Sequence, residues 1–150
     1  MTQSQNIIPI GSDHGGLLLK NFIIEKLNES NFEFFDFGTF TDASVDYPDF
    51  IHPVAFAINS GKFKKGIVIC GSGQGANMTA NKYSNVRSAL CWDIEQTRLT
   101  RQHNDANILA LPGRFIDFDL AVEMVKVFFS TDFEGGRHEK RIEKISNLIH

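Results

Sequence analysis

The residues best suited to chemistry in this chain are a cysteine and the glycine-rich loop that follows it. Ile67-Val68-Ile69-Cys70 is typical of a buried strand, and Gly71-Ser72-Gly73-Gln74-Gly75-Ala76 comes directly after it. Glycines tolerate the positive φ and the close approach that let backbone N–H groups converge on an anion. Because open α/β sheets bind ligands beyond the carboxyl ends of their strands, we expect the Cys70 thiol beside an anion site. This pairing favours chemistry on a small, negatively charged substrate.

Cys70 also has a simpler interpretation, because a free cysteine is most often a small buried hydrophobe. The positive end of a following helix would favour the thiolate, which is the reactive form. The residues alone leave these two interpretations about equally open. Cys91 also stands at an expected strand end, but Trp92-Asp93 follows it in place of a glycine loop. We therefore interpret Cys91 as structural.

The glycine loop itself fits a second class of ligand. Gly71, Gly73 and Ala76 satisfy the G-x-G-x-x-[GA] dinucleotide pattern, and Asp93 lies at a tolerable distance for a ribose contact. The match is weak, because the loop follows the third expected strand and not the first. No Walker lysine and serine pair follows the loop, which argues against a nucleoside-triphosphate P-loop.

A second polar segment, Gly11-Ser12-Asp13-His14-Gly15-Gly16, follows the first expected strand and opens a helix. This position places Asp13 and His14 at a carboxyl strand end and near the positive end of a helix. Ser12 or Asp13 could simply cap that helix. Capping alone, however, requires neither His14 nor the paired glycines, so we expect a ligand site here.

Four further basic residues offer acid–base groups and phosphate ligands. His103, at the end of an expected helix, could act as an acid or base near neutral pH, or simply complement the helix dipole. Arg137 and Arg141 are four residues apart, so they share a helix face and could grip a phosphate together. Their spacing alone slightly favours a solvated charged face. Arg114, after Pro112-Gly113, is a third candidate for the anion.

Short apolar runs alternate with longer segments of helical periodicity along the chain. The expected strands cover residues 7–10, 32–37, 66–70, 86–91 and 107–111, and the expected helices cover 14–28, 49–59, 75–82, 94–103, 117–129 and 139–148. This alternation predicts βαβ units and a parallel sheet covered on both faces. Strand order is not readable from the pattern. Pro9 should lie near the start of its strand or at an irregularity, because proline gives up a ladder donor.

Length and composition limit the class of protein. A chain of 150 residues, 42% hydrophobic and 22% charged, is typical of one folded domain over residues 1–150. A net charge of -3 argues against general nucleic-acid binding. Two cysteines make no disulfide framework, and the sequence shows no signal peptide or membrane span. We expect a cytoplasmic protein without a membrane partner, with most of its 14 phenylalanines in the core.

The five histidines show no metal-ligand spacing such as H-x-x-x-H, and the two cysteines form no C-x-x-C pair. The sequence therefore predicts no metal site.

Several motifs, taken in order, resemble the type B ribose-5-phosphate isomerases of the ribose/galactose-phosphate isomerase family, and they span nearly the whole chain. They are Gly11-Ser12-Asp13-His14-Gly15-Gly16, Asp46-Tyr47-Pro48, Cys70-Gly71-Ser72-Gly73-Gln74-Gly75, Ala80-Asn81-Lys82, Arg101-Gln102-His103-Asn104-Asp105-Ala106-Asn107 and Glu134-Gly135-Gly136-Arg137-His138. The resemblance implies a three-layer α/β/α Rossmann-like sandwich with a five-stranded parallel sheet. It also implies a homodimer, sometimes paired into tetramers, whose active sites use residues of both subunits. The implied reaction interconverts ribose 5-phosphate and ribulose 5-phosphate, in the pentose phosphate pathway, without a metal or other cofactor.

The resemblance further implies a role for each matching residue. Cys70 would be the base that moves a proton between carbon 2 and carbon 1, while His103, assisted by Asp13, would open the furanose ring. The cis-enediolate intermediate would be stabilised by groups of the glycine loop: Ser72, Gly71, Gly73 and Gly75. The sugar and the phosphate would be held by the other polar matches: Tyr47, Asn104, His14, Arg114, Arg137 and Arg141.

Relatives that lack the cysteine carry a glutamate just beyond the loop, where this chain has Ala76, which agrees with a cysteine base. The leading hypothesis is therefore a sugar-phosphate isomerase. Its substrate could instead be a hexose 6-phosphate, of allose or galactose. A non-catalytic sugar-phosphate sensor is a second alternative. A nucleotide-binding module is a third, but it leaves Cys70 and His103 without a role.

Overall fold

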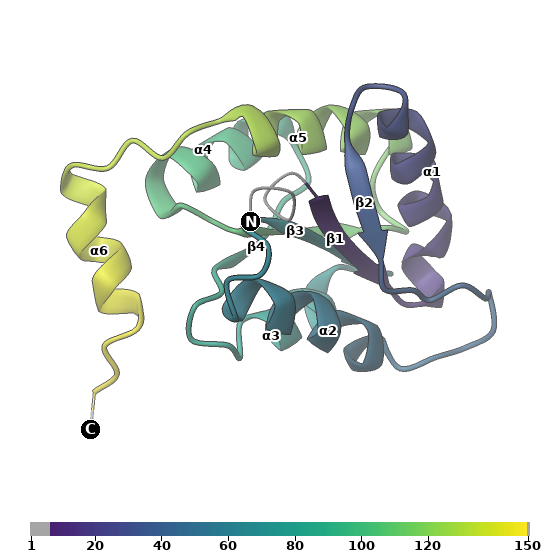
Figure 1. Cartoon of the computed structure of the whole chain (residues 1–150), viewed down its shortest axis with the longest axis horizontal. Coiled ribbons are helices and arrows are strands. Elements are labelled where there is room, and N and C mark those ends of the chain that lie inside the picture. The colour runs from purple at the N-terminus through teal and green to yellow at the C-terminus, as the bar shows by residue number, and fades with distance from the viewer. Residues whose placement is uncertain (1–6, 150) are drawn as a thin grey trace.

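A parallel sheet forms the centre of the computed structural model, which describes residues 7–149 (Figure 1). Its strands are β1 (Ile7–Ser12), β2 (Glu33–Asp36), β3 (Gly66–Cys70), β4 (Ser88–Leu90) and β5 (Ile108–Pro112). They are arranged in the order β2-β1-β3-β5-β4, and every neighbouring pair is parallel. The five-stranded parallel sheet is thus confirmed, and the order places β1 beside β3.

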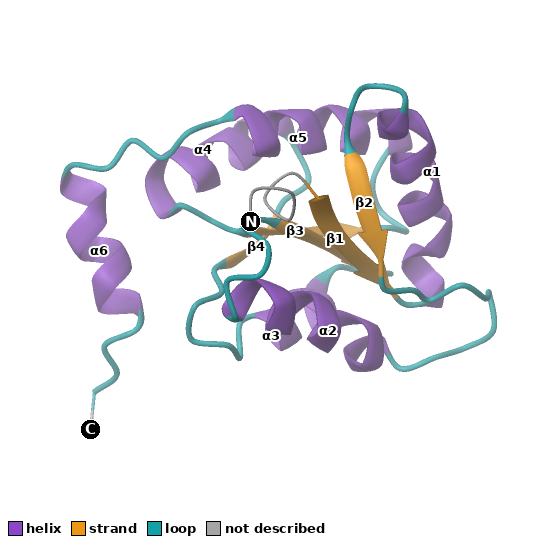
Figure 2. Cartoon of the chain, in the orientation of Figure 1, coloured by secondary structure: helices purple, strands orange, loops and turns teal. Residues whose placement is uncertain are grey.

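Helices cover both faces of this sheet. They are α1 (Leu17–Asn28), preceded by a short 3-10 helix η2 (His14–Gly16), α2 (Tyr47–Asn59), α3 (Gln74–Ala80), α4 (Ile94–Asn104), α5 (Phe118–Ser130) and α6 (Arg137–Ile145). Helices α1, α4 and α5 lie on one face, and α2 and α3 on the other (Figure 2). The predicted three-layer sandwich is therefore confirmed. None of the described helices combines the length and the apolar character needed to cross a membrane.

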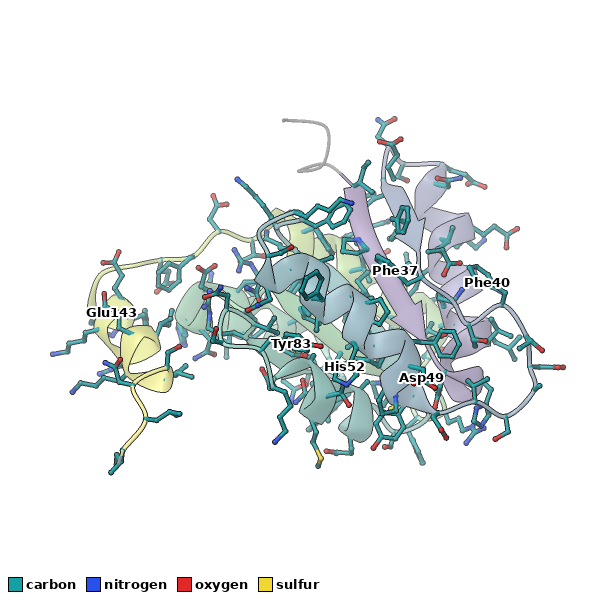
Figure 3. The ribbon with its side chains drawn as sticks, turned by 60° about the horizontal axis from the view of Figure 1, so that its bottom comes forward. Phe37, Phe40, Asp49, His52, Tyr83 and Glu143 are labelled. Atoms are coloured by element: carbon teal, nitrogen blue, oxygen red, sulfur yellow. The ribbon has the colours of Figure 1, made fainter. Side chains whose placement is uncertain are left out.

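The apolar pattern explains these layers. In β3, which is buried throughout, Ile67 and Ile69 pack into the core on the α1 and α5 side, whereas Val68 and Cys70 pack on the α2 and α3 side. This alternation is the period of two that a strand imposes on its side chains. On the α2 and α3 side, the exposed side chain of His52 meets the half-buried side chain of Tyr83, with Nδ1 and the phenol oxygen 2.6 Å apart (Figure 3).

Two sequence predictions need correction. The last helix begins at Arg137 and ends at Ile145, earlier at both ends than expected, because Gly135 and Gly136 adopt positive φ and end the preceding loop. Fewer phenylalanines are fully buried than expected: only Phe63 and Phe128, since several others lie on or near β2, an edge strand with solvent along one side. Six more are partly buried and pack against the core: Phe22, Phe32, Phe34, Phe37, Phe118 and Phe129.

Pro9 lies near the start of its strand, as expected. It is in register with Phe35 of β2, whereas the register between β1 and β3 begins one residue later, at Ile10. Pro9 has no N–H to donate, but it precedes the first residue of β1 that is in register with β3, so the hydrogen bonds between these two strands do not need that donor.

Candidate active site

The adjacency of β1 and β3 brings the two polar segments of the sequence together. Ser12 is in register with Ile69, so Asp13 and Cys70 are the next residues at the carboxyl ends of neighbouring strands. The chain leaves β1 toward β2 on one side and returns to β3 on the other side. Ligand sites of open α/β sheets lie at such a reversal of strand order.

Asp13 and His14 are both held by hydrogen bonds. Asp13 is buried, and its Oδ1 accepts a 3.1 Å hydrogen bond from the backbone of Gly16, so it does cap η2. Nδ1 of His14 accepts a 3.1 Å hydrogen bond from the backbone of Val45. Because Nδ1 accepts, the neutral ring carries its proton on Nε2, which can donate to an anion.

The glycine loop is shaped by close contacts. Gly73 adopts a left-handed φ of 77°, and a Cβ there would lie 2.5 Å from Leu90. A Cβ at Gly75 would lie 2.4 Å from the ring of Tyr47, so this ring packs directly on the first turn of α3. Only glycine fits either position. Tyr47, far away in sequence, is thereby placed beside the loop.

Arg114 approaches the same loop from β5. Its backbone donates a 2.9 Å hydrogen bond to the carbonyl of Gly71, and the backbone of Gly113 donates one of 2.9 Å to the carbonyl of Cys70. A Cβ added at Gly71 would lie 3.3 Å from the Arg114 guanidinium. The exposed Arg114 side chain therefore lies over the loop, close to where an anion would bind.

These residues define the carboxyl-edge group. It unites the buried thiol, the loop, the first histidine and one arginine, and it consists of Asp13, His14, Tyr47, Cys70, Gly71, Ser72, Gly73, Gly75 and Arg114. Ser72 is exposed, and its Oγ accepts a 3.3 Å hydrogen bond from the backbone of Gln74. The hydroxyl proton of Ser72 stays available for donation to a ligand.

The remaining predicted site residues lie elsewhere. His103 and Asn104 end α4, which leads into the amino end of β5, and Arg137 and Arg141 are exposed on α6. We call these four residues the α4–α6 group. In Figure 1, α6 projects from the body at the left, away from the start of α1 at the right. Because β3 alone spans about 13 Å from its amino end to its carboxyl end, one chain does not bring His103, at the amino ends of the strands, to Cys70 at the carboxyl ends.

Buried hydrogen bonds hold the α4–α6 group in place. Arg101 donates from Nε to the carbonyl of Thr131 at 3.0 Å and from Nη1 to that of Ala106 at 2.7 Å. The backbone of Glu134 donates a 3.1 Å hydrogen bond to the carbonyl of Gln102. The segment before α6 is therefore fixed against the end of α4.

His138 is a residue whose importance the sequence did not reveal. Its ring stacks on that of His103, with centroids 4.5 Å apart and an interplanar angle of 17°. Burial, followed by the charges of Arg137 and His103, lowers the pKa of His138. The four-residue spacing from Glu134 to His138 is a signal, but the two intervening positive-φ glycines obscure it.

Two further groups bear on the chemistry of the chain. Burial raises the pKa of the Cys91 thiol to about 11, which supports a structural role for this residue. Within residues 7–149, His103, Glu134 and His138 are the group of at least three metal-ligating side chains that could hold an ion, with ligand atoms within 4.8 Å of one another. The spacing from Glu134 to His138 is a local signal for two of these ligands, but the sequence does not show that His103 joins them.

Comparison with known proteins gives one consistent result. A family model for ribose/galactose isomerase matches residues 8–145. Ribose-5-phosphate isomerase B of Escherichia coli is 39% identical over 141 residues, covering 94% of this chain and 95% of that protein.

Solved structures agree in both fold and sequence. The crystal structure of a ribose 5-phosphate isomerase from Thermotoga maritima superposes with a TM-score of 0.92 and 45% identity, covering 95% of this chain and 98% of that one. Ribose-5-phosphate isomerase B from Mycoplasma genitalium, solved with bound ribulose-5-phosphate, superposes with a TM-score of 0.89 and 42% identity, covering 94% of each chain.

Proposed function

This chain belongs to the ribose/galactose isomerase family, and from this premise we propose that it interconverts ribose 5-phosphate and ribulose 5-phosphate. Membership makes the chain an aldose–ketose isomerase. The observation that carries the proposal is the Cys70 thiol at the end of β3, next to Asp13 and the glycine loop. The substrate is supported by the name of the Escherichia coli relative and by the ribulose-5-phosphate bound in the Mycoplasma structure.

The first step is the opening of the furanose ring. We assign it to His103, which transfers a proton to the ring oxygen while the anomeric hydroxyl loses its own proton. Asp13 orients the sugar hydroxyls and assists this exchange. Histidine in general suits this task because the ordinary pKa of an imidazole is close to neutral pH, so the ring can both donate and accept a proton.

The second step moves a proton between two carbons. The Cys70 thiolate removes the proton from carbon 2 and returns it at carbon 1 through a cis-enediolate, while the proton of the carbon 2 hydroxyl passes to the oxygen on carbon 1. The negative charge that develops on oxygen needs donors already in position. The backbone N–H groups of Gly71, Gly73 and Gly75 and the Ser72 hydroxyl fit this role, because the loop is held by its contacts with Tyr47 and Leu90. This chemistry uses no metal ion.

Both steps act on one small sugar, although Cys70 lies at the carboxyl ends of the strands and His103 at their amino ends. We therefore propose that the active site forms between two copies of the chain. One copy contributes the carboxyl-edge group, and the other contributes the α4–α6 group. Arg137 and Arg141 would then join His14 and Arg114 around the phosphate. A two-fold dimer built in this way has two identical sites.

Turnover of ribose 5-phosphate in the presence of EDTA tests the activity, with allose 6-phosphate and galactose 6-phosphate assayed in parallel. We expect clear turnover of ribose 5-phosphate that EDTA does not reduce. Activity on a hexose phosphate alone would keep the mechanism and change the substrate. Absence of turnover with all three sugars would contradict an isomerase and favour a sugar-phosphate sensor.

A further inference from the structure

We propose that His103, Glu134 and His138 form an inhibitory site for a zinc ion. The three side chains come from the end of α4, the loop before α6 and the first turn of α6. Their ligating atoms all lie within 4.8 Å of one another. Two imidazoles and one carboxylate are a ligand set that Zn²⁺ accepts in proteins, with a fourth position left for water.

The cluster is close to the size that zinc requires. Ligand atoms about 2.1 Å from a tetrahedral ion lie about 3.4 Å from each other. Nε2 of His138 and Oε1 of Glu134 are already 3.5 Å apart. The distances from His103 to the other two ligands therefore need to shorten by no more than about 1.4 Å, which a rotation of its half-buried side chain supplies.

The backbone holds the three ligands on one framework. Glu134 donates its backbone N–H to the carbonyl of Gln102, the residue just before His103, and His138 donates its own to Gly135 at 3.2 Å. The two ends of the cluster are thus tied together without using any ligating atom. Preorganisation of this kind is what a metal site needs in order to bind tightly.

A buried nitrogen of the cluster makes no hydrogen bond. His138 is 5% exposed, and among the described residues its Nε2 has no hydrogen-bond partner, although Oε1 of Glu134 lies 3.5 Å away as an ion-pair contact. An unsatisfied buried polar atom is costly, and a zinc ion would satisfy this one.

The neighbouring arginines oppose a cation but do not prevent its binding. Arg137 and Arg141 are both exposed, so water and salt screen their repulsion. The ligand bonds form instead at a cluster whose central ring is buried. This balance favours an ion that bonds strongly to imidazole, such as Zn²⁺, over Mg²⁺, which prefers oxygen ligands and keeps its water.

Zinc at this site would occupy the nitrogen with which His103 exchanges a proton. The bound ion would therefore stop ring opening, and removal of the ion would restore it. This inhibition rests on the proposed function of His103, whereas the binding of zinc does not. The two parts are therefore tested by separate measurements.

Binding is measured by calorimetric titration of ZnCl₂ into the metal-free full chain without an added histidine tag. We expect one zinc ion per chain, and at least about tenfold weaker binding in Glu134→Gln. Glu143→Gln, which makes the same charge change on the exposed face of α6 (Figure 3), should bind zinc like the wild type. Cys70→Ala should also retain binding. Equal binding by wild type and Glu134→Gln, or loss of binding in Cys70→Ala, would overturn the site.

Activity is measured on the same proteins with and without zinc. We expect zinc to inhibit the wild type and EDTA to restore it, while Glu134→Gln remains active and resists zinc at concentrations that inhibit Glu143→Gln. Bound zinc without inhibition would overturn the inhibitory role. A wild type that is inactive in EDTA would contradict the proposed function, and the titration would still decide whether the zinc site exists.

Discussion

The two cysteines show how surroundings separate identical side chains. Cys70 and Cys91 both stand at the carboxyl end of a strand segment, and both are buried, at 5% and 2% exposed. Cys91 packs into the apolar core beside α5, where burial raises its pKa to about 11. Cys70 instead precedes the glycine loop and lies next to Asp13. The difference lies in the neighbours of each thiol, and not in its depth.

Replacing each cysteine by alanine tests this distinction. Cys70→Ala should lower kcat by at least about 100-fold, because it removes the proposed base, and should leave sugar-phosphate binding largely unchanged. Cys91→Ala is the matched control, with kcat near wild type and a loss of stability of about 1 kcal/mol. Steady-state kinetics and calorimetric binding of ribose 5-phosphate provide the measurements. Near wild-type turnover in Cys70→Ala would show that the base is another group.

Lys65 predicts a pH dependence of stability. Burial, followed by the charge of Arg101, lowers the pKa of its ammonium group to about 8 from an ordinary value of 10.5. Between these two values the unfolded chain binds more protons than the folded chain, so the contribution of Lys65 to stability rises with pH. Below about pH 8 the ammonium is charged in both states, and its full penalty is present.

Lys65→Met should therefore stabilise the protein at pH 7, by on the order of 1 kcal/mol because the side chain is only partly buried. The advantage should shrink as the pH rises from 8 to 10.5. Urea unfolding of the variant and the wild type at several pH values measures the difference and cancels the titration of other groups. Lys64→Met, at the exposed neighbouring lysine, is the control. A constant difference across this range would contradict the prediction.

Among the secondary-structure elements, a buried ion pair links α1 to the last residue of β2. Nζ of Lys20, which is fully buried, lies 2.7 and 2.9 Å from the two carboxylate oxygens of Asp36. Asp36 in turn accepts a 2.9 Å hydrogen bond from the backbone of Gly38, on the loop after β2. Nζ also lies 5.2 Å from the ring centroid of Phe40, on the same loop. This loop runs on to Val45, which binds His14.

Removing either member of the pair should have unequal effects. Asp36→Asn leaves the buried Lys20 charge without a counterion and should destabilise the fold by about 3 kcal/mol. Lys20→Met should cost less, because Asp36 is 26% exposed and keeps some water. Both should raise KM through the loop that holds His14. Thermal unfolding and kinetics measure these effects. Equal losses of stability would show that the buried charge is not the dominant cost.

At the scale of the whole molecule, the proposed catalytic groups are divided between the carboxyl ends and the amino ends of the strands. The carboxyl-edge group is complete within one chain, and the α4–α6 group is fixed by Arg101 on the other side. Helix α6 leaves the body of the molecule after Gly136 (Figure 1). The proposed mechanism therefore requires a second copy of the chain to supply the other half of the site.

Mixing two inactive variants tests this arrangement. Cys70→Ala and His103→Ala should each be inactive, but chains of both refolded together should recover about a quarter of wild-type activity. Half of the random dimers are mixed, and each mixed dimer contains one site with both residues intact. The same mixture without refolding is the control for exchange between dimers. Absence of recovery, with mass spectrometry of intact dimers showing that mixed dimers form, would place both residues in one chain.

The local features of this protein follow from its sequence. The strand at residues 66–70 begins and ends where the apolar run predicts, and the glycine loop follows it. The sequence also predicted the fold class and the family, because hydrophobic periodicity and motifs each depend on residues close together in the chain. The roles of the site residues, from Cys70 to Arg141, stay predictions.

Tertiary structure alone decided which of these features meet. The strand order makes Asp13 and Cys70 neighbours at the carboxyl ends of the strands, whereas His103 lies at the amino ends. The packing of the last segment brings Glu134 and His138 to His103. The strand order also leaves several phenylalanines on or near β2 only partly buried, because β2 is an edge strand. The physical reason is that contacts between distant segments depend on how whole layers pack. The free energy of that packing is distributed over many residues, so no short stretch of sequence predicts it.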